Sequence, residues 1–329
     1  KPKKIFNMKF DVIVGNPPYQ LNDGGGMGTS AKPIYQKFIQ QAKKLSPKYM
    51  SFIIPARWYS GGKGLDEFRN EMLNDKRISV LVDYFNSAEC FPGVDISGGV
   101  CYFVWERDKE NECNVVSIKD GHVDKMRRPL LEQNVNTFIR FNKAVSIIRN
   151  VKLKREKSFE TMVSSRKPFG INSSVKVSND VRPGYVKVYS YPKSGFISTD
   201  KIVKNSTWIS EIKVMIAKAY GERGSFPYLV IGKPFVAEEN SCCSETYLVI
   251  GPVANEERAI NVKKYLTTKF VRFLILQKKN TQNAAKGVYS EVPMQNFDEE
   301  WTDEKLYVKY KLSDEEIEFI DSMVKPMDL

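Results

Sequence analysis

Histidine and cysteine are scarce in this sequence of 329 residues. The single histidine, His122, cannot build a multi-histidine metal site, and no recognisable nucleophile motif accompanies it, so we expect it at the surface. The five cysteines form an odd set without CxxC spacing, which favours a reduced, cytoplasmic protein. No apolar run is long enough to span a bilayer and no signal-peptide pattern opens the chain, so we expect no membrane segment. With one histidine and no CxxC spacing, we also expect no bound metal.

Charge of one sign dominates the middle of the chain. The sequence has 51 Lys and Arg against 39 Asp and Glu, a net charge of +12. Residues 111–297 hold 31 basic and 16 acidic side chains (+15), whereas residues 298–329 hold 4 and 11 (−7). The basic excess favours a surface that binds a polyanion, and the open alternative is a solvated surface rich in lysine.

The first hundred residues alternate short apolar runs with helical patterns, which is typical of an α/β fold with a mainly parallel sheet. Residues 99–106 follow an apolar strand without room for a helix, so we expect the two to pair antiparallel and to close one side of the sheet. The remaining elements expected here are strands at 10–14, 49–55 and 78–85 and helices at 33–46 and 65–74.

Beyond residue 110 the pattern changes to a mixture of short strands and helices. We expect a strand at 113–118, an amphipathic helix at 137–150, one helix at 256–279 and two short helices in the tail, the second capped by Ser313. Residues 158–297 otherwise hold many short β-like pieces ending in Gly, Pro or Ser. The expected division of the chain is 1–130, a linking helix at 131–157, 158–297 and a helical tail at 298–329.

The chemically most informative residues are Asn16, Pro17, Pro18 and Tyr19, directly after the first apolar strand. Two prolines stiffen the backbone and remove two N–H donors, so carbonyl oxygens can be held outward in fixed positions. The Asn16 amide oxygen and the Pro17 carbonyl can then accept both hydrogens of an –NH2 group, while the Tyr19 ring stacks on a planar substrate. The structural alternative is an ordinary proline turn that ends a strand.

The segment FDVIVGNPPYQ resembles the catalytic motif of methyltransferases that use S-adenosylmethionine, most closely the N6-adenine DNA methyltransferases of restriction-modification systems. FIIPARW and ECFPGVDISGGVCYFVWE resemble the segments that come after that motif in the Eco57I class. The resemblance implies the C-terminal half of a Rossmann-like methyltransferase sheet, followed by a mixed α+β target-recognition domain. It also implies that the target adenine is flipped out of double-stranded DNA and held between Tyr19 and Phe103.

The long basic continuation favours a DNA substrate over the glutamine side chains that similar enzymes methylate. Segments near 164–171, 232–247 and 280–294 resemble recognition-domain segments of the same family. The expected DNA contacts within them are Arg166, Lys167, Lys233, Asn280, Gln282 and Asn283, each of which is otherwise an ordinary solvated residue.

The glycine motif that binds the cofactor in this family lies before the catalytic strand, and only fifteen residues precede Asn16. The cofactor-binding residues are therefore unknown, although Asn16 and Pro17 are expected beside the cofactor. We interpret the glycine clusters at 24–28 and 60–64 as mobile loops at the active site or the DNA. We expect the C-terminal part of a larger enzyme, or one half of a split one, with a missing N-terminal half or a separate restriction subunit as partner and no methylation by this chain alone.

Other functions have weaker support. The open alternative from another class is a DNA-binding specificity subunit in which the Asn16–Tyr19 motif is vestigial. A metal-dependent nuclease needs an acidic residue followed by Glu-x-Lys, and Asp200 with Glu211 and Lys213 fits that pattern, which chance often produces. Cys242 and Cys243 are expected as a structural or surface pair, since adjacent cysteines seldom form a disulfide.

Overall fold

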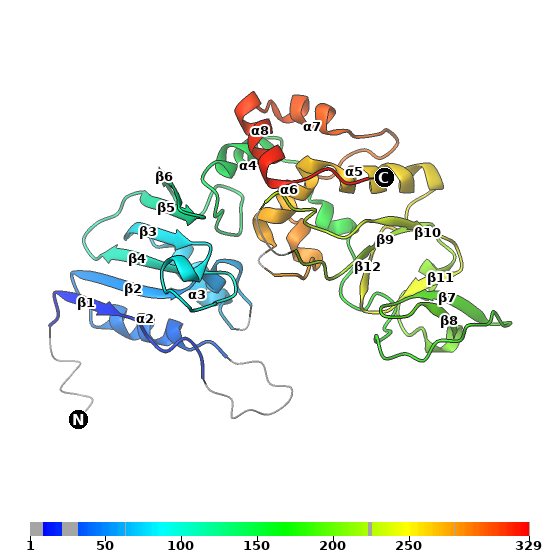
Figure 1. The fold of residues 1–329 in the computed structure, drawn as a ribbon, viewed down its shortest axis with the longest axis horizontal. Helices are drawn as coiled ribbons and strands as arrows, with labels where there is room; N and C mark the ends of the chain where they lie inside the picture. Colours follow the sequence, from blue (N-terminus) through cyan, green and yellow to red (C-terminus); the bar gives the residue numbers. More distant parts are fainter. Residues whose placement is uncertain (1–8, 22–31, 63, 223–225, 280, 329) are drawn as a thin grey trace. The chain divides into compact units, whose positions relative to one another are not determined.

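The computed structural model describes residues 9–21, 32–62, 64–222, 226–279 and 281–328. The chain, drawn in Figure 1, divides into two compact units, Lys1–Val145 and Ser146–Leu329. Each unit has its own hydrophobic core. The finer division expected at residues 130, 157 and 297 stays a prediction. The glycine cluster at 24–28 lies outside the described residues.

A six-stranded mixed sheet forms the first unit and confirms the α/β class expected from the sequence. The expected mainly parallel sheet was wrong, because three of its five strand pairings are antiparallel. The strands follow the order β1-β2-β4-β3-β5-β6. β1 and β2 pair in parallel, and β4 inserts antiparallel between β2 and β3. The bounds are β1 Val12–Gly15, β2 Tyr49–Pro55, β3 Ile78–Tyr84, β4 Val100–Glu106, β5 Cys113–Lys119 and β6 His122–Arg128.

The expected antiparallel pairing of β3 with β4 is confirmed, but the hairpin does not close one side of the sheet. β5 pairs in parallel with β3, and β6 pairs antiparallel with β5, so two further strands lie beyond the hairpin. β6 is mostly exposed and therefore lacks the apolar alternation by which a strand is recognised in a sequence. His122 is exposed at its start, as expected.

Helices α2 (Tyr35–Lys44) and α3 (Asp66–Asn74) pack on one face of this sheet. Because side chains alternate along a strand, Met50, Phe52 and Ile54 of β2 all point to that face, where they join buried residues of both helices in one core. The other face of β2 and β4 is only half-buried.

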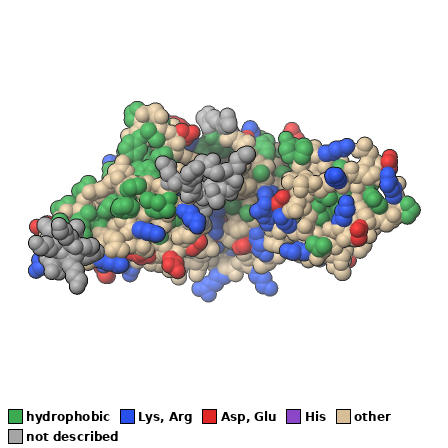
Figure 2. All heavy atoms as spheres, turned by 90° about the horizontal axis from the view of Figure 1, so that it is seen from below, with side chains coloured by type: hydrophobic (Ala, Val, Ile, Leu, Met, Phe, Trp, Pro, Cys, Tyr) green, Lys and Arg blue, Asp and Glu red, His purple; other side chains and the backbone are tan. Residues whose placement is uncertain are grey.

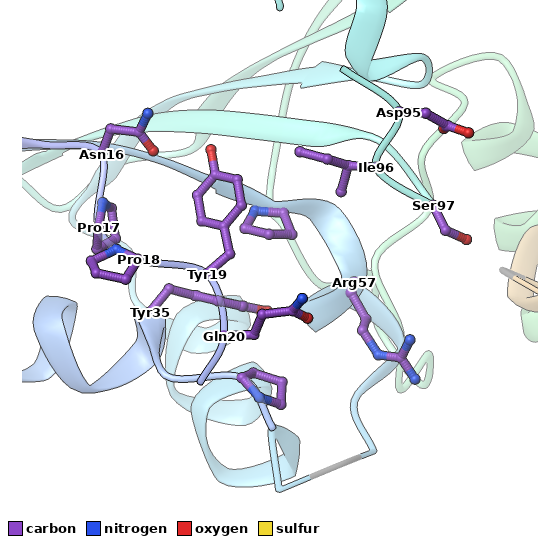
Figure 3. A pocket seen from close by; sticks show the side chains of 12 residues that line it. Asn16, Pro17, Pro18, Tyr19, Gln20, Tyr35, Arg57, Asp95, Ile96 and Ser97 are labelled. Atoms are coloured by element: carbon purple, nitrogen blue, oxygen red, sulfur yellow. The ribbon is translucent and has the colours of Figure 1, made fainter. Parts of the chain in front are cut away.

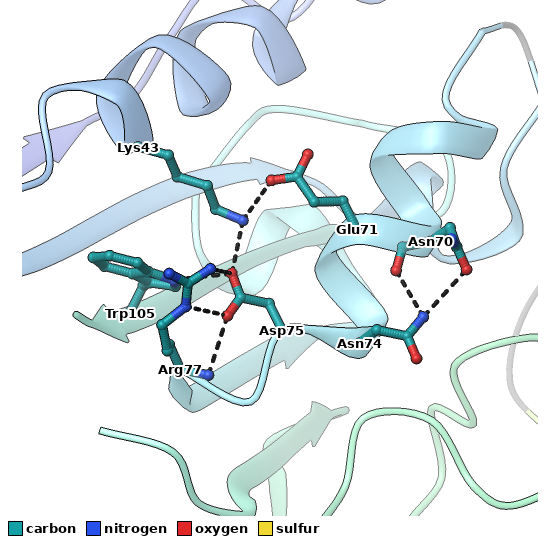
Figure 4. Close-up of polar contacts among 7 residues, drawn as sticks. All are labelled: Lys43, Asn70, Glu71, Asn74, Asp75, Arg77 and Trp105. Atoms are coloured by element: carbon teal, nitrogen blue, oxygen red, sulfur yellow. Dashed lines mark hydrogen bonds and ion pairs between the residues drawn. The ribbon is translucent and has the colours of Figure 1, made fainter. Parts of the chain in front are cut away.

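A polar cluster connects both helices to the sheet at the end of α3 (Figure 4). The Asp75 carboxylate, 4% exposed, accepts hydrogen bonds from Lys43 Nζ at 2.8 Å and from Arg77 Nε at 2.7 Å. The Trp105 indole donates a third at 3.0 Å. Burial alone would raise the pKa of Asp75, but the hydrogen bonds from Arg77 and Lys43 outweigh it and hold the pKa at about 2. One buried carboxylate after α3 therefore links α2, Arg77 just before β3, and β4.

The second unit contains two three-stranded sheets, with orders β10-β9-β12 and β11-β7-β8. Their strands are β7 Tyr185–Tyr189, β8 Gly195–Ser198, β9 Lys213–Ala217, β10 Phe235–Ala237, β11 Ser241–Cys243 and β12 Tyr247–Ile250. The helices are α4 Ala144–Leu153, α5 Glu256–Thr267, α6 Lys269–Lys278, α7 Asp303–Tyr310 and α8 Asp314–Met323. Cys242 and Cys243 are free thiols buried in β11, so they form a structural pair.

Two helices differ from the sequence expectation. The helix expected at 137–150 begins only at Ala144. The single helix expected at 256–279 is two helices, because Thr268 adopts an extended conformation and its hydroxyl caps α6 by accepting a hydrogen bond from Val271 N at 3.2 Å. The two tail helices are confirmed, and Ser313 forms a complete capping box with Glu316.

Candidate active site and nucleic-acid interface

The Asn16–Tyr19 segment leaves the sheet at the carboxyl end of β1. Pro17 is buried and anchors the turn, whereas Asn16 is exposed. No described residue forms a hydrogen bond with the Asn16 side chain. Its amide oxygen and the stiff proline backbone are therefore available to a ligand.

Gly15 permits this exit because its backbone runs against the Phe52 ring. A Cβ atom added at Gly15 would lie 2.7 Å from Phe52 Cε1, which is too close for any real contact. Gly15 and Phe52 are register partners on β1 and β2, and Phe52 is held in the core. Glycine is required here by a close approach of chain segments.

A cavity of about 740 Å³ opens beside this turn (Figure 3). Its lining comes from the Asn16 turn, the start of α2, the end of β2 and the segment before β4. The lining residues are Asn16, Pro17, Pro18, Tyr19, Gln20, Pro33, Tyr35, Pro55, Arg57, Asp95, Ile96 and Ser97. The volume lies within the range of about 300–1,000 Å³ that is common for small-molecule sites.

A backbone hydrogen bond holds Tyr19 beside the cavity. Its carbonyl accepts a hydrogen bond from Ile34 N at 3.2 Å, just before α2. The hydroxyl groups of Tyr19 and Tyr35 are buried without a hydrogen-bond partner among the described residues. Burial raises the pKa of Tyr19, with further contributions from Cys90 and Cys101, so its hydroxyl stays protonated and available as a donor.

The wall opposite Tyr19 is the loop between β3 and β4, and Figure 3 shows the Ile96 side chain pointing toward the Tyr19 ring. Ser87 Oγ shapes this loop, because it donates to Val94 O at 2.7 Å and accepts from Ile96 N at 2.8 Å. Sequence analysis missed Ile96, since an isoleucine in a loop carries no chemical signature. It also missed Gln20, Tyr35, Arg57, Asp95 and Ser97.

Phe103 does not line this cavity. Its side chain is fully buried in the middle of β4 and stacks on Phe52 with 6.2 Å between ring centroids. The register places Gly15, Phe52 and Phe103 in one row on the helix-covered face. The structure thus brings Asn16, Pro17, Pro18 and Tyr19 together and leaves Phe103 in the core.

The expected DNA contacts lie in the second unit, around one end of the β10-β9-β12 sheet. β9 ends at Ala217, the register partner of Tyr247 at the start of β12. Arg166 Nη2 forms an ion pair at 2.5 Å with Glu245, two residues before that start. Lys167 lies 3.9 Å from the same carboxylate, whose pKa Arg166 lowers. Arg166 and Lys167 are therefore partly neutralised here.

The remaining expected contacts reach the same end of this sheet. Tyr220, three residues after β9, donates its N–H to Gln282 O at 2.8 Å, and Ala219 forms a bridge with Asn283. Lys233 is exposed two residues before β10. Asn280 lies outside the described residues. Figure 2 shows that basic side chains on the face in view alternate with acidic ones, so no uniformly basic face is seen there.

Lys213, one member of the sparse nuclease pattern, is fully buried on β9. Its ammonium donates hydrogen bonds to the carbonyls of Ile209 and Glu211, at 3.2 and 2.8 Å. Across the described ranges, no group of three or more His, Cys, Asp or Glu side chains is placed to hold a metal ion. The described helices include none that is long and apolar enough to cross a membrane.

The first part of the chain matches a known protein family. Residues 2–91 match the model of the family described as Eco57I restriction-modification methylase. The resemblance to Eco57I-type methylases is confirmed. The match covers the Asn16–Tyr19 turn, α2, β2, α3, β3 and the beginning of the loop after β3.

A relative in Mycoplasma pneumoniae (strain ATCC 29342 / M129 / Subtype 1), described as "Uncharacterized adenine-specific methylase", is 39% identical over 136 residues. The matched part is 39% of this chain and 32% of the relative, so the chain spans about a third of that protein.

Two solved structures are similar over most of this chain. The type IIG restriction endonuclease BpuSI is 14% identical, with 95% of this chain and 49% of that chain covered and a TM-score of 0.37. The type IIL restriction-modification enzyme MmeI, solved in complex with DNA, is 9% identical, with 96% and 55% covered and a TM-score of 0.45.

Proposed function

We propose that this chain is part of an adenine-N6 DNA methyltransferase of a restriction-modification system. The observation that carries the proposal is the exposed Asn16 amide beside two prolines, in a cavity flanked by Tyr19 and Ile96. The Eco57I methylase match over the same segment supports it. In this proposal the first unit supplies the substrate side of the active site, and the second unit recognises double-stranded DNA.

The Asn16 amide oxygen and the Pro17 carbonyl would accept the two N6 hydrogens of a flipped adenine, which turns the nitrogen lone pair toward the methyl donor. Tyr19 would stack on one face of the base, and Ile96 replaces Phe103 as our proposed contact on the other face. An amide oxygen is too weak a base to keep the proton released from N6, so that proton passes to solvent.

S-adenosylmethionine would supply an electrophilic methyl group at this site. The described residues fit the acceptor side of that chemistry, because the Asn16 amide is exposed and Pro17 lines the same cavity directly after a sheet strand. Asn16 and Pro17 are the only residues that we propose beside the cofactor, and we assign no other cofactor-binding residue. The five free thiols fit our proposal of a reducing, cytoplasmic location.

The test is transfer of a labelled methyl group from S-adenosylmethionine to duplex DNA by a protein with its full natural sequence, followed by chromatography of the nucleosides. We expect label in N6-methyladenine and a loss of at least about 100-fold in kcat for Asn16→Ala. Asn16→Gln keeps the amide but shifts it by one methylene, so we expect a similar loss.

The Tm and the DNA affinity of both variants should equal those of the unchanged protein, because Asn16 is exposed and unbonded to described residues. If the unchanged protein binds duplex DNA but methylates nothing, the specificity-subunit alternative replaces this proposal.

A further inference from the structure

Arg57 is a cation without a counter-ion among the described residues, in the wall of the Asn16 cavity. It follows β2 in a short helical turn, Ala56–Ser60, and its side chain is half-buried. Within the described ranges it has no ion pair and no side-chain hydrogen bond, and its Nε is buried without a partner. A half-buried guanidinium of this kind favours an anionic ligand, because partial desolvation is unfavourable without a compensating charge.

Arg57 lies at the opposite end of the cavity from Asn16, with the Tyr19 ring between them (Figure 3). The cavity of about 740 Å³ therefore has an amide at one end, an aromatic ring in the middle and a guanidinium at the other end. A planar base on Tyr19 would leave the Arg57 end for the sugar and phosphate of the same nucleotide. The guanidinium fork suits phosphate, to which it can donate two hydrogen bonds.

The groups around Arg57 do not compete with such a ligand. Tyr35, beneath the cavity, is only 1% exposed, and its hydroxyl has no hydrogen-bond partner among the described residues. Burial raises the pKa of Tyr35, with a smaller contribution from Cys101, and proximity to Arg57 opposes the rise. The hydroxyl is therefore neutral and does not act as the counter-ion. Asp95 is exposed, and Figure 3 shows its side chain pointing away from Arg57.

We propose that Arg57 binds a phosphate of the nucleotide whose base occupies the Asn16–Tyr19 end of the cavity. The inference rests on the proposed function for the identity of the base. For the phosphate it rests on a guanidinium that has no ion pair or hydrogen bond among the described residues. Arg57 is then a positioning residue, because a phosphate held at one end fixes how far the base enters at the other.

Small nucleotides test this subsite on the chain itself. The affinities of deoxyadenosine and of deoxyadenosine 5′- and 3′-monophosphate are measured by ligand-observed NMR. We expect at least one monophosphate to bind about 10-fold more tightly than the nucleoside, and this preference to disappear in Arg57→Ala. Arg57→Lys keeps the charge but not the fork, so an intermediate preference is expected. Arg127→Ala, which removes an exposed arginine on β6, is the matched control and should behave as the unchanged chain.

Two results would overturn the inference: equal affinity for nucleoside and monophosphates in the unchanged chain, or a preference that survives in Arg57→Ala. Failure of the proposed function has a different signature. If thymidine monophosphate binds as tightly as the adenine nucleotides and depends equally on Arg57, the phosphate subsite stands and the adenine substrate does not.

Discussion

Arg140 forms a two-point ion pair with Asp83, in which Nε lies 2.7 Å from Oδ2 and Nη2 lies 2.8 Å from Oδ1. Asp83, on β3, is fully buried. The same guanidinium donates to Gly98 O at 2.9 Å, and Gly98 lies at the end of the loop that carries Ile96. An ion pair between β3 and the segment before α4 thereby holds one wall of the candidate active site.

Replacing Asp83 by Asn should be strongly destabilising, because Arg140 would lose its charge partner while 11% exposed. We expect the free energy of unfolding to fall by about 3 kcal/mol in urea denaturation. The control is Asp108→Asn at the exposed pair with Arg107, where no measurable change is expected. Equal effects of the two substitutions would contradict the importance of the buried pair.

Gly15→Ala should displace the Asn16–Tyr19 turn. The added methyl group would approach the Phe52 ring to 2.7 Å, and Phe52 cannot withdraw because it is buried in the core. We expect a loss of about 1–3 kcal/mol in the free energy of unfolding, the usual effect of overpacking, and reduced methyl transfer in the natural protein. Gly62→Ala is an informative comparison. Its Cβ would meet no atom within 4 Å, so only the strain of its positive φ of 77° would act there.

Shortening the partner side chain tests the cause. Phe52→Leu in the Gly15→Ala background should recover part of the lost activity if the clash is responsible. No recovery, with both proteins folded, would point to a different role for Gly15.

Most of the first sheet was predictable because most of its strands are apolar runs, two of which end at Gly15 and Pro55. The residue numbers of β2 match the expectation, and β1, β3 and β4 differ from it by one or two residues at their ends. The turn at Asn16–Tyr19 was predictable for a different reason, since two prolines after a strand fix a turn locally. Features that depend only on neighbouring residues were therefore visible in the sequence.

Features that depend on distant residues were not visible. The position of Phe103 depends on its register with Phe52 and Gly15, and adjacent side chains on a strand point to opposite faces. The hydrogen bond from Arg140 to Gly98 O forms only in the folded protein, because the two residues are 42 positions apart in the sequence. Thr268 interrupts a continuous helical pattern with one extended residue, which its periodicity does not reveal.

Asp75 should make the first unit sensitive to acid. Its folded-state pKa of about 2 lies below the value of about 3.9 in an unfolded chain, so its stabilising contribution is present above pH 4 and is lost as the pH falls toward 2. The stability difference between the unchanged chain and Asp75→Asn should shrink by about 1 kcal/mol between pH 5 and pH 3 in urea denaturation. Asp108→Asn, at an exposed site, should give no such pH dependence, and a constant difference for Asp75→Asn would contradict the role of the cluster.

Lys213 should give the second unit the opposite response, at alkaline pH. Burial lowers its pKa to about 8, below the value of about 10.4 expected in an unfolded chain. Between these values the unfolded chain binds the proton more tightly than the folded chain does. The penalty for burying the charge is therefore present below pH 8 and is relieved as the pH rises toward 10.4.

Lys213→Met should remove this gain of stability at alkaline pH, because methionine has a similar length and no charge to titrate. Relative to that variant, the unchanged chain should gain about 2 kcal/mol of stability between pH 7.5 and pH 9.5, measured by urea denaturation under reducing conditions. Burial raises the pKa of the Cys242 and Cys243 thiols, so they stay protonated in the folded chain over this range, and their titration in the unfolded chain is common to both proteins. Lys201→Met, at an exposed position in the same unit, should leave the pH dependence as it is in the unchanged chain. Parallel pH profiles for the unchanged chain and Lys213→Met would show that Lys213 keeps its proton throughout, held by the carbonyls of Ile209 and Glu211.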